Sequence, residues 1–140
     1  MELSMSVAQS WQLSRTAQFG ARRSSSGTVI TVRGELDAAN ADQLAAYVQR
    51  NATRSRRVIL DLRGLEFIGT AGFSALLRIN VACSGAQVNW AMVPSQAVSR
   101  LLRLCDPDGT LPVTTRRAVS PLKSNRTQGE DSGPLLQLVP

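Results

Sequence analysis

A buried strand, a small-residue turn and a helix follow one another between residues 58 and 77, and this stretch constrains the fold most. Residues 58–62 form an apolar run rich in β-branched side chains, which is typical of a strand covered on both faces. Phe73, Leu76 and Leu77 have helical spacing. Between them, residues 69–72 predict a tight turn. The helix that starts there presents free N–H groups and its positive dipole end at the surface, which suits a phosphate or an acidic group.

Strands and helices alternate along the rest of the chain. Residues 28–33 predict a strand because they are rich in β-branched side chains, and the stripe of apolar residues over 38–50 predicts a helix with Asp37 as its N-cap. The remaining expectations are strands at 11–19, 87–93 and 110–114, a loop at 20–27, and helices over 70–83 and 94–105. Because strand–helix–strand units normally pair in parallel, we expect an α/β fold: a mixed, mostly parallel sheet of four to five strands, with helices mainly on one face.

Length and composition favour one domain with tails. The 140 residues are 43% hydrophobic and 19% charged, which is ordinary for a globular protein. We expect a disordered N-terminus over 1–10, the domain over 11–115, and a flexible tail over 116–140, which is rich in Ser, Pro, Gly and Gln. No apolar run approaches the roughly 18 residues of a membrane span, and the start lacks a basic region followed by an apolar one. These features predict a cytoplasmic protein that does not enter a membrane.

The net charge of +6 raises the question of nucleic acid. Residues 28–115 hold nine Arg against seven Asp and Glu, so most of the excess lies in the flanks. The clearest cluster is Arg50, Arg54, Arg56 and Arg57, at the end of a predicted helix and in the loop after it. Basic residues there favour the helix dipole, and no aromatic residue is interleaved for stacking on bases. We therefore expect no nucleic-acid partner.

Catalysis and cofactors are disfavoured by residue types. The chain has no His, and its two cysteines, Cys83 and Cys105, have no metal-binding spacing. Asp61 and Glu66 are the tempting carboxylate pair, but Asp61 is expected to close a central strand and Glu66 to lie in a loop, with no nucleophile or metal set nearby. We expect a protein that is not an enzyme and has no metal site or cofactor.

Three matches in order carry a resemblance to a known family. They are the Gly-Glu-Leu-Asp corner at 34–37, the apolar strand ending in Asp61-Leu62, and the strand-turn-helix with Gly72. The chain resembles the STAS domain of bacterial anti-sigma factor antagonists. The resemblance implies binding to an anti-sigma factor, commonly an ATP-dependent protein kinase, and release of a sigma factor. In many members that kinase phosphorylates a Ser or Thr just before the glycine, and the phosphorylated antagonist dissociates from the anti-sigma factor.

The chain departs from the family at the phosphoacceptor. The family turn is usually Asp-Ser-Ser-Gly or Asp-Ser-Thr-Gly, which places Gly69 at the Asp, Thr70 at the first hydroxyl residue and Ala71 at the acceptor. Three interpretations stay open. The protein has lost this phosphorylation switch, or Thr70 or Ser74 takes over as phosphoacceptor, or Thr70 is only the N-cap of the helix. Ser74 is the weaker acceptor candidate because it lies one turn into the helix.

The resemblance also implies a site and its alternatives. The expected partner-binding residues are Gly34, Asp37, Gly69, Thr70, Ala71, Gly72, Phe73 and Ser74. A second hypothesis is a sensor that binds a nucleotide or another anion at the N-terminus of the same helix, as in some relatives of this domain. The family fold packs the helices of Cys83 and Cys105 on one face, so a redox pair is a minor hypothesis beside two free cysteines used as small core residues.

Overall fold

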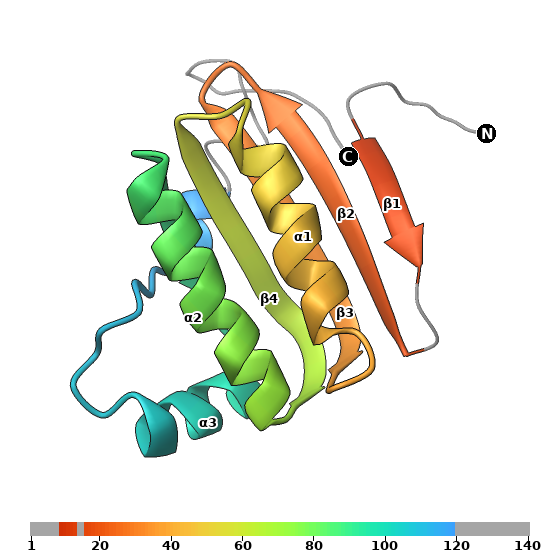
Figure 1. Cartoon of the computed structure of the whole chain (residues 1–140), viewed down its shortest axis with the longest axis vertical. Coiled ribbons are helices and arrows are strands. Elements are labelled where there is room, and N and C mark those ends of the chain that lie inside the picture. The colour runs from red at the N-terminus through yellow and green to blue at the C-terminus, as the bar shows by residue number, and fades with distance from the viewer. Residues whose placement is uncertain (1–8, 14–15, 120–140) are drawn as a thin grey trace.

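The computed structural model describes residues 9–13 and 16–119, and for residues 9–13 it describes the backbone alone. Five strands form one sheet in the order β1-β2-β3-β4-β5 (Figure 1). The strands are β1 (Gln9–Leu13), β2 (Ala17–Ser24), β3 (Gly27–Leu36), β4 (Arg57–Ile68) and β5 (Asn89–Val93). The helices are α1 (Ala41–Ala52), α2 (Thr70–Gly85), α3 (Gln96–Cys105) and the 3-10 helix η1 (Arg116–Ala118).

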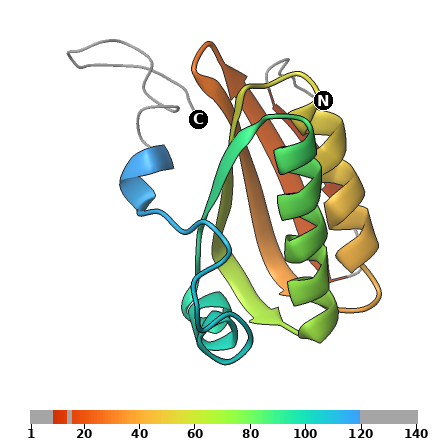
Figure 2. The same cartoon turned by 60° about the vertical axis from the view of Figure 1, so that its left-hand side comes forward.

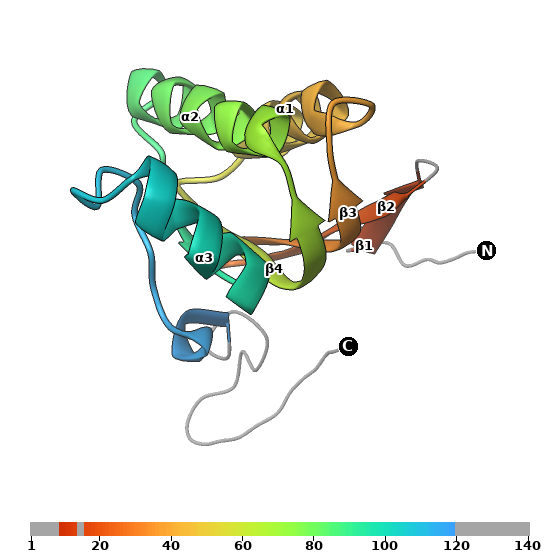
Figure 3. The same cartoon turned by 90° about the horizontal axis from the view of Figure 1, so that it is seen from below.

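The sheet is mixed, as expected. Pairs β1-β2 and β2-β3 are antiparallel, whereas β3-β4 and β4-β5 are parallel and are joined through α1 and α2. Helices α1 and α2 lie side by side over one face, α3 lies at one end of the sheet, and η1 lies on the opposite face (Figures 1 and 3). The expected α/β fold, with its main helices on one face, is confirmed.

The core lies between the sheet and helices α1 and α2. Alternate strand residues point into it, among them Phe19, Ile30, Leu60 and Met92, each fully buried. Val98 and Leu102 of α3 join the same cluster. A second, smaller cluster lies on the other face of the sheet and contains Val29, Ile59, Val93 and Val119.

The N-terminal hairpin differs from the prediction. A single strand over 11–19 and a loop over 20–27 were expected, but the chain turns before Ala17 and β2 continues to Ser24, which pairs with Gly27. Phe19 and Ala21 are buried on the helix side, so pairing with β3 and burial outweigh the low strand propensity of this Gly- and Ser-rich segment. The hairpin turn therefore needs only residues 25 and 26.

Strand β4 is twice as long as expected because it contains two irregularities. Its register against β3 shifts between Thr31 and Arg33 and again between Gly34 and Glu35, each time with one extra residue in β4. The first extra residue turns Leu65 to the buried face, and the second restores the original alternation, so Ile68 faces the core as Leu62 does. Asp61 therefore lies within the strand, and Glu66 is a strand residue.

The first helix starts later than expected. Asp37 was the expected N-cap, but the helix begins at Ala41 with Asn40 as its N-cap. Asn40 is 1% exposed. Its Oδ1 accepts from Asp37 N at 3.0 Å, and its Nδ2 donates to Glu35 O and to Thr16 Oγ1, both at 2.9 Å. Asn40 thus closes the corner between β3 and α1.

The C-terminal part of the domain also differs. The strand expected over 110–114 is reduced to a single bridge between Met92 and Val113. The described fold continues past the expected boundary at 115, because Val119 is buried against the sheet. The rest of the expected tail and residues 1–8 lie outside the described residues. Within the described part of the chain, no helix is both long and apolar enough to cross a membrane.

Removal of the Asn40 side chain should destabilise the domain. Asn40→Ala leaves Asp37 N–H without its partner and Glu35 O with only the longer bond from Thr16 Oγ1, at a cost of about 2–3 kcal/mol in the free energy of unfolding. Urea unfolding measures this. The control is Asn51→Ala, which removes one hydrogen bond, from Asn51 Nδ2 to Tyr47 O, and should cost about 1 kcal/mol or less. Equal losses for the two variants would contradict the role of Asn40.

Candidate partner-binding site

The turn between β4 and α2 is attached to the end of β3. Gly69 is the N-cap of α2 and is extended, and its N–H donates to Leu36 O at 3.0 Å. Its carbonyl accepts the first helical bond, from Phe73 N at 3.1 Å. The interpretation that Thr70 caps the helix is therefore wrong, since Thr70 is the first residue of the helix. Because Gly69 has no side chain, no side-chain group caps the first N–H groups of α2.

Gly72 has no room for a side chain. A Cβ at this position would lie 2.6 Å from Ile68 Cγ1 and 3.0 Å from Leu36 Cδ2. Leu36 is fully buried, so it fills the space that the missing side chain leaves. The glycine thus allows the last residues of β3 and β4 to pack directly under the first turn of α2.

The backbone around Gly34 also leaves no room for a side chain. Gly34 has a φ of +97°, and a Cβ on it would lie 2.2 Å from Thr16 O. The next residue, Glu35, donates its N–H to that same oxygen at 2.9 Å. Asp37 follows, and its Oδ1 accepts from Ala39 N at 2.9 Å, which supports the short turn before α1. Glycine is required at 34 by both its conformation and its surroundings.

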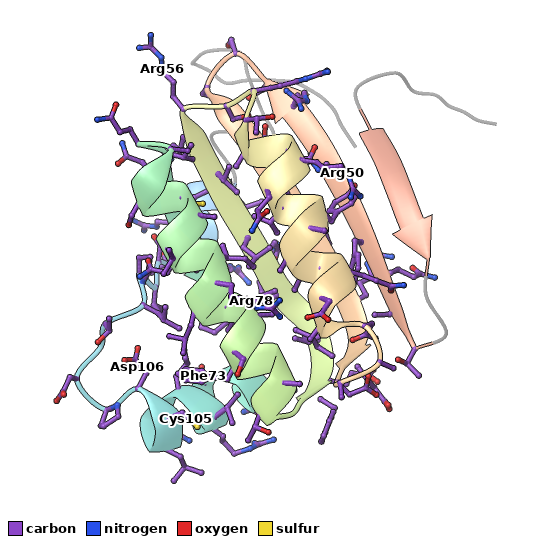
Figure 4. All side chains as sticks on the ribbon, in the orientation of Figure 1. Arg50, Arg56, Phe73, Arg78, Cys105 and Asp106 are labelled. Atoms are coloured by element: carbon purple, nitrogen blue, oxygen red, sulfur yellow. The ribbon has the colours of Figure 1, made fainter. Side chains whose placement is uncertain are left out.

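The expected site residues come together at one end of the sheet. Gly34 pairs with Leu65 and Leu36 pairs with Ile68, so the corner and the turn lie at the carboxyl ends of neighbouring parallel strands. Thr70 and Ser74 are exposed, whereas Ala71 and Phe73 are half-buried and pack against the core. Phe73 lies at the lower end of α2 in Figure 4.

One exposed aromatic residue beside the turn was missed from the sequence. Phe67 is 50% exposed, and its ring lies against Gly69, where a Cβ would be 3.6 Å from Phe67 Cε2. It was missed because the strand was expected to end at 62, which left Phe67 outside any predicted element. Its side chain adds exposed apolar area next to the turn, where Thr70 and Ser74 are also exposed.

Asp61 forms an ion pair on the face of the sheet opposite α1 and α2. Its carboxylate accepts from Arg63 Nε and Nη2, each at 2.8 Å, and Asp61 is 6% exposed. The hydrogen bonds to Asp61 raise the pKa of Arg63. Asp61 therefore makes its side-chain bonds within β4 and not with the turn at 69–72. Among the described residues, no group of three or more His, Cys, Asp or Glu could hold a metal ion.

The outer face of α2 is apolar beyond the turn. Leu77 and Val81 are 41% and 71% exposed. With Gln49, Arg78 and Ala82 they line a shallow hollow between α1 and α2. Arg78 bridges the two helices through an ion pair with Asp42 at 2.8 Å. Figure 4 shows Arg78 between the two helices.

The two cysteines are far apart. Cys83 lies in the last turns of α2, is buried, and has a pKa raised by that burial. Cys105 is exposed at the end of α3. Figures 1 and 2 show α3 and the end of α2 at opposite ends of the molecule. Both thiols are free, and this structure does not bring the suggested redox pair together.

Comparison with known proteins identifies the domain. The STAS domain family model matches residues 18–119. Anti-sigma-F factor antagonist RsfA of Mycobacterium tuberculosis is 32% identical over 101 residues, which cover 68% of this chain and 79% of that protein. Osmosensory protein A of the same organism is 42% identical over 71 residues, covering 51% of this chain. The chain matches less than half of the latter's length, 45%.

Solved structures agree on the fold. An anti-sigma factor antagonist from Mycobacterium paratuberculosis superposes with a TM-score of 0.63 at 21% identity and covers 76% of this chain and 94% of its own. The anti-sigma factor antagonist SpoIIAA in its unphosphorylated form gives 0.59 at 17% identity, with 74% and 93% covered. The chain therefore belongs to the STAS-domain family of anti-sigma factor antagonists, in agreement with the resemblance of residues 34–37, 58–62 and 69–72.

Proposed function

We propose that the protein binds an anti-sigma factor through the corner at 34–37 and the turn at 69–74, and so releases a sigma factor in the cytoplasm. The observation that supports this most is the hydrogen bond from Gly69 N to Leu36 O, together with Leu36 packed under Gly72, because these contacts unite the two motifs in one surface. Binding alone carries the function, and no step of catalysis is needed.

The absence of a hydroxyl at residue 71 defines the regulation that we propose. Ala71 stands at the position where the family carries its phosphoacceptor, so the protein binds in a permanently unphosphorylated state. Thr70 and Ser74 remain the alternative acceptors, since both side chains are exposed at the start of α2. Thr70 is the better placed, because a phosphate on the first helical residue is stabilised by the helix dipole.

Substitutions at the exposed part of this surface should abolish partner binding. Phe67→Asp puts a charge beside the turn and should weaken binding to the cognate anti-sigma factor by about tenfold or more, since buried apolar anchors carry most of an interface's affinity. Calorimetry with each anti-sigma factor of the source organism measures this. Val113→Asp is the matched control, because Val113 is 52% exposed and Phe67 is 50% exposed. Full-length protein that binds none of these factors would refute the proposal.

Restoring a hydroxyl should restore the switch. If the partner is a kinase, Ala71→Ser should gain one phosphate at residue 71 in the presence of ATP, and its affinity should then fall by about tenfold or more through charge repulsion and desolvation. Mass spectrometry locates the phosphate. The wild type should gain none. Phosphate at Thr70 of the wild type, lost in Thr70→Ala, would instead show that the switch has moved by one residue.

A sensor role is the second candidate, and two observations favour it. The N-terminus of α2 has neither a side-chain cap nor an acidic residue in its first turn, and a relative bears the name Osmosensory protein A. A nucleotide at about 100 times its Kd would stabilise the fold by about 2.7 kcal/mol, which thermal unfolding detects. Loss of that stabilisation in Thr70→Glu, but not in Ser99→Glu, would locate the anion at the turn. No stabilisation by ATP, GTP or inorganic phosphate would exclude this role.

A further inference from the structure

Arginines from three separate segments meet at the end of the domain opposite the turn. Arg22 and Arg23 end β2, and Arg54, Arg56 and Arg57 lie between α1 and the start of β4. Arg116 and Arg117 belong to η1, and Arg50 lies in the last turn of α1 over the ring of Tyr47. Figure 4 shows Arg56 beyond the upper end of the sheet and Arg50 on the side of α1. Only the group at 50–57 is visible as a cluster in the sequence.

Close packing and a side-chain hydrogen bond hold the β2-β3 hairpin against the loop between α1 and β4. A Cβ on Gly27 would lie 2.6 Å from Arg57 O, so the β2-β3 turn rests on the start of β4. The hydroxyls of Thr28 and Ser55 are hydrogen-bonded to each other, which ties β3 to the loop that carries Arg54 and Arg56. The hairpin that carries Arg22 and Arg23 therefore lies beside the loop that carries Arg54 and Arg56.

The third segment, η1, lies on the face of the sheet opposite α1 and α2. Val119 follows η1 directly and packs with Val29 and Ile59. Val29 is the strand partner of Arg22, so η1 lies beside the row of the sheet that contains Arg22. Arg22 is half-buried, and its Nε has no hydrogen-bond partner among the described residues.

Among the described carboxylates, only that of Asp61 acts electrostatically on an arginine of this end, Arg22. Glu35, Asp37 and Glu66 lie at the carboxyl ends of β3 and β4, and Asp42 starts α1. Asp106 and Asp108 follow α3, and Asp61 is paired with Arg63. The arginines of the loop at 53–57 and of η1 therefore form no salt bridge with a described carboxylate, and they carry the positive charge of this arginine surface.

Three features identify the kind of partner that suits this surface. All its cations are guanidinium groups, which bind phosphate in a bidentate manner. The large exposed apolar residues of the described chain lie outside the turn at 24–27 and the loop at 53–56, so these segments offer nothing to insert into a lipid surface. Residues 120–140 hold two basic and two acidic residues, so that segment cannot neutralise the surface.

We propose that the arginine surface binds the phosphate backbone of a nucleic-acid duplex without reading its sequence. Backbone contacts need neither aromatic stacking nor apolar wedges, in contrast to single-strand binding and membrane insertion. The proposal revises the expectation that nucleic acid is not a partner, because that expectation counted the arginines at 22–23 and 116–117 as parts of a loop and a tail. It does not depend on binding to an anti-sigma factor, since that site lies at the other end of the sheet.

A charge-matched pair of variants tests the proposal. The full-length protein is titrated against a labelled DNA duplex of about 20 base pairs at a series of salt concentrations starting near 50 mM, with anisotropy as readout. Arg54→Glu/Arg56→Glu should weaken binding at least about tenfold and lower the slope of log affinity against log salt by about two, since each lost phosphate contact removes about 0.9. Arg100→Glu/Arg103→Glu on α3 changes the net charge equally and should stay within about threefold of the wild type.

Three results would overturn the proposal: no duplex binding near 50 mM salt, equal weakening by both pairs of substitutions, or binding to phosphatidylserine vesicles without binding to the duplex. Thermal unfolding of each variant confirms that it is folded. Both target side chains, Arg54 and Arg56, are exposed, so their replacement should leave the melting temperature within a few degrees of the wild type.

Discussion

The hydrogen bond from Gly69 N to Leu36 O, with the Leu36 side chain packed under Gly72, is the contact on which the rest of the structure depends. It joins the ends of two parallel strands at the point where each passes to its helix. Leu36 is fully buried and packs below the first turn of α2. The position of that turn is therefore set by core packing rather than by a loop. The proposed partner-binding surface is therefore ordered within the fold itself, which would lower the entropic cost of association.

The order of elements and the glycine turn were predictable because they depend on local chemistry. Residues 28–33 and 58–62 are apolar and β-branched, and the stripe of α1 has helical period, so each element could be inferred from its own residues. What could not be inferred depends on pairing. The first register shift of β4 turns Leu65 inward, out of step with Leu60 and Leu62, and nothing in residues 63–68 alone indicates an extra residue.

Asn40 illustrates a second limit of the sequence. Its side chain joins Asp37, Glu35 and Thr16, of which Thr16 is 24 residues away in the chain. A short polar residue after Asp37 is an ordinary start of a helix, and either residue satisfies the local preference for an N-cap. Only the fold, which brings Thr16 beside the end of β3, makes Asn40 a buried centre of hydrogen bonds. Asp37 instead accepts a hydrogen bond within the turn before α1.

The two ends of the sheet differ in charge for a reason that follows from its parallel strands. Parallel connections place the N-termini of α1 and α2 at the carboxyl ends of the strands and their C-termini at the other end. Helix dipoles favour carboxylates at the first end and arginines at the second, as with Asp42 and Arg50 in α1. The dipole does not account for Arg22, Arg23, Arg116 or Arg117, which belong to a strand and to η1. The excess of arginine therefore exceeds what helix stability requires. The proposed docking turn and the proposed nucleic-acid surface lie at opposite ends of the sheet, so the two proposals are compatible in one molecule.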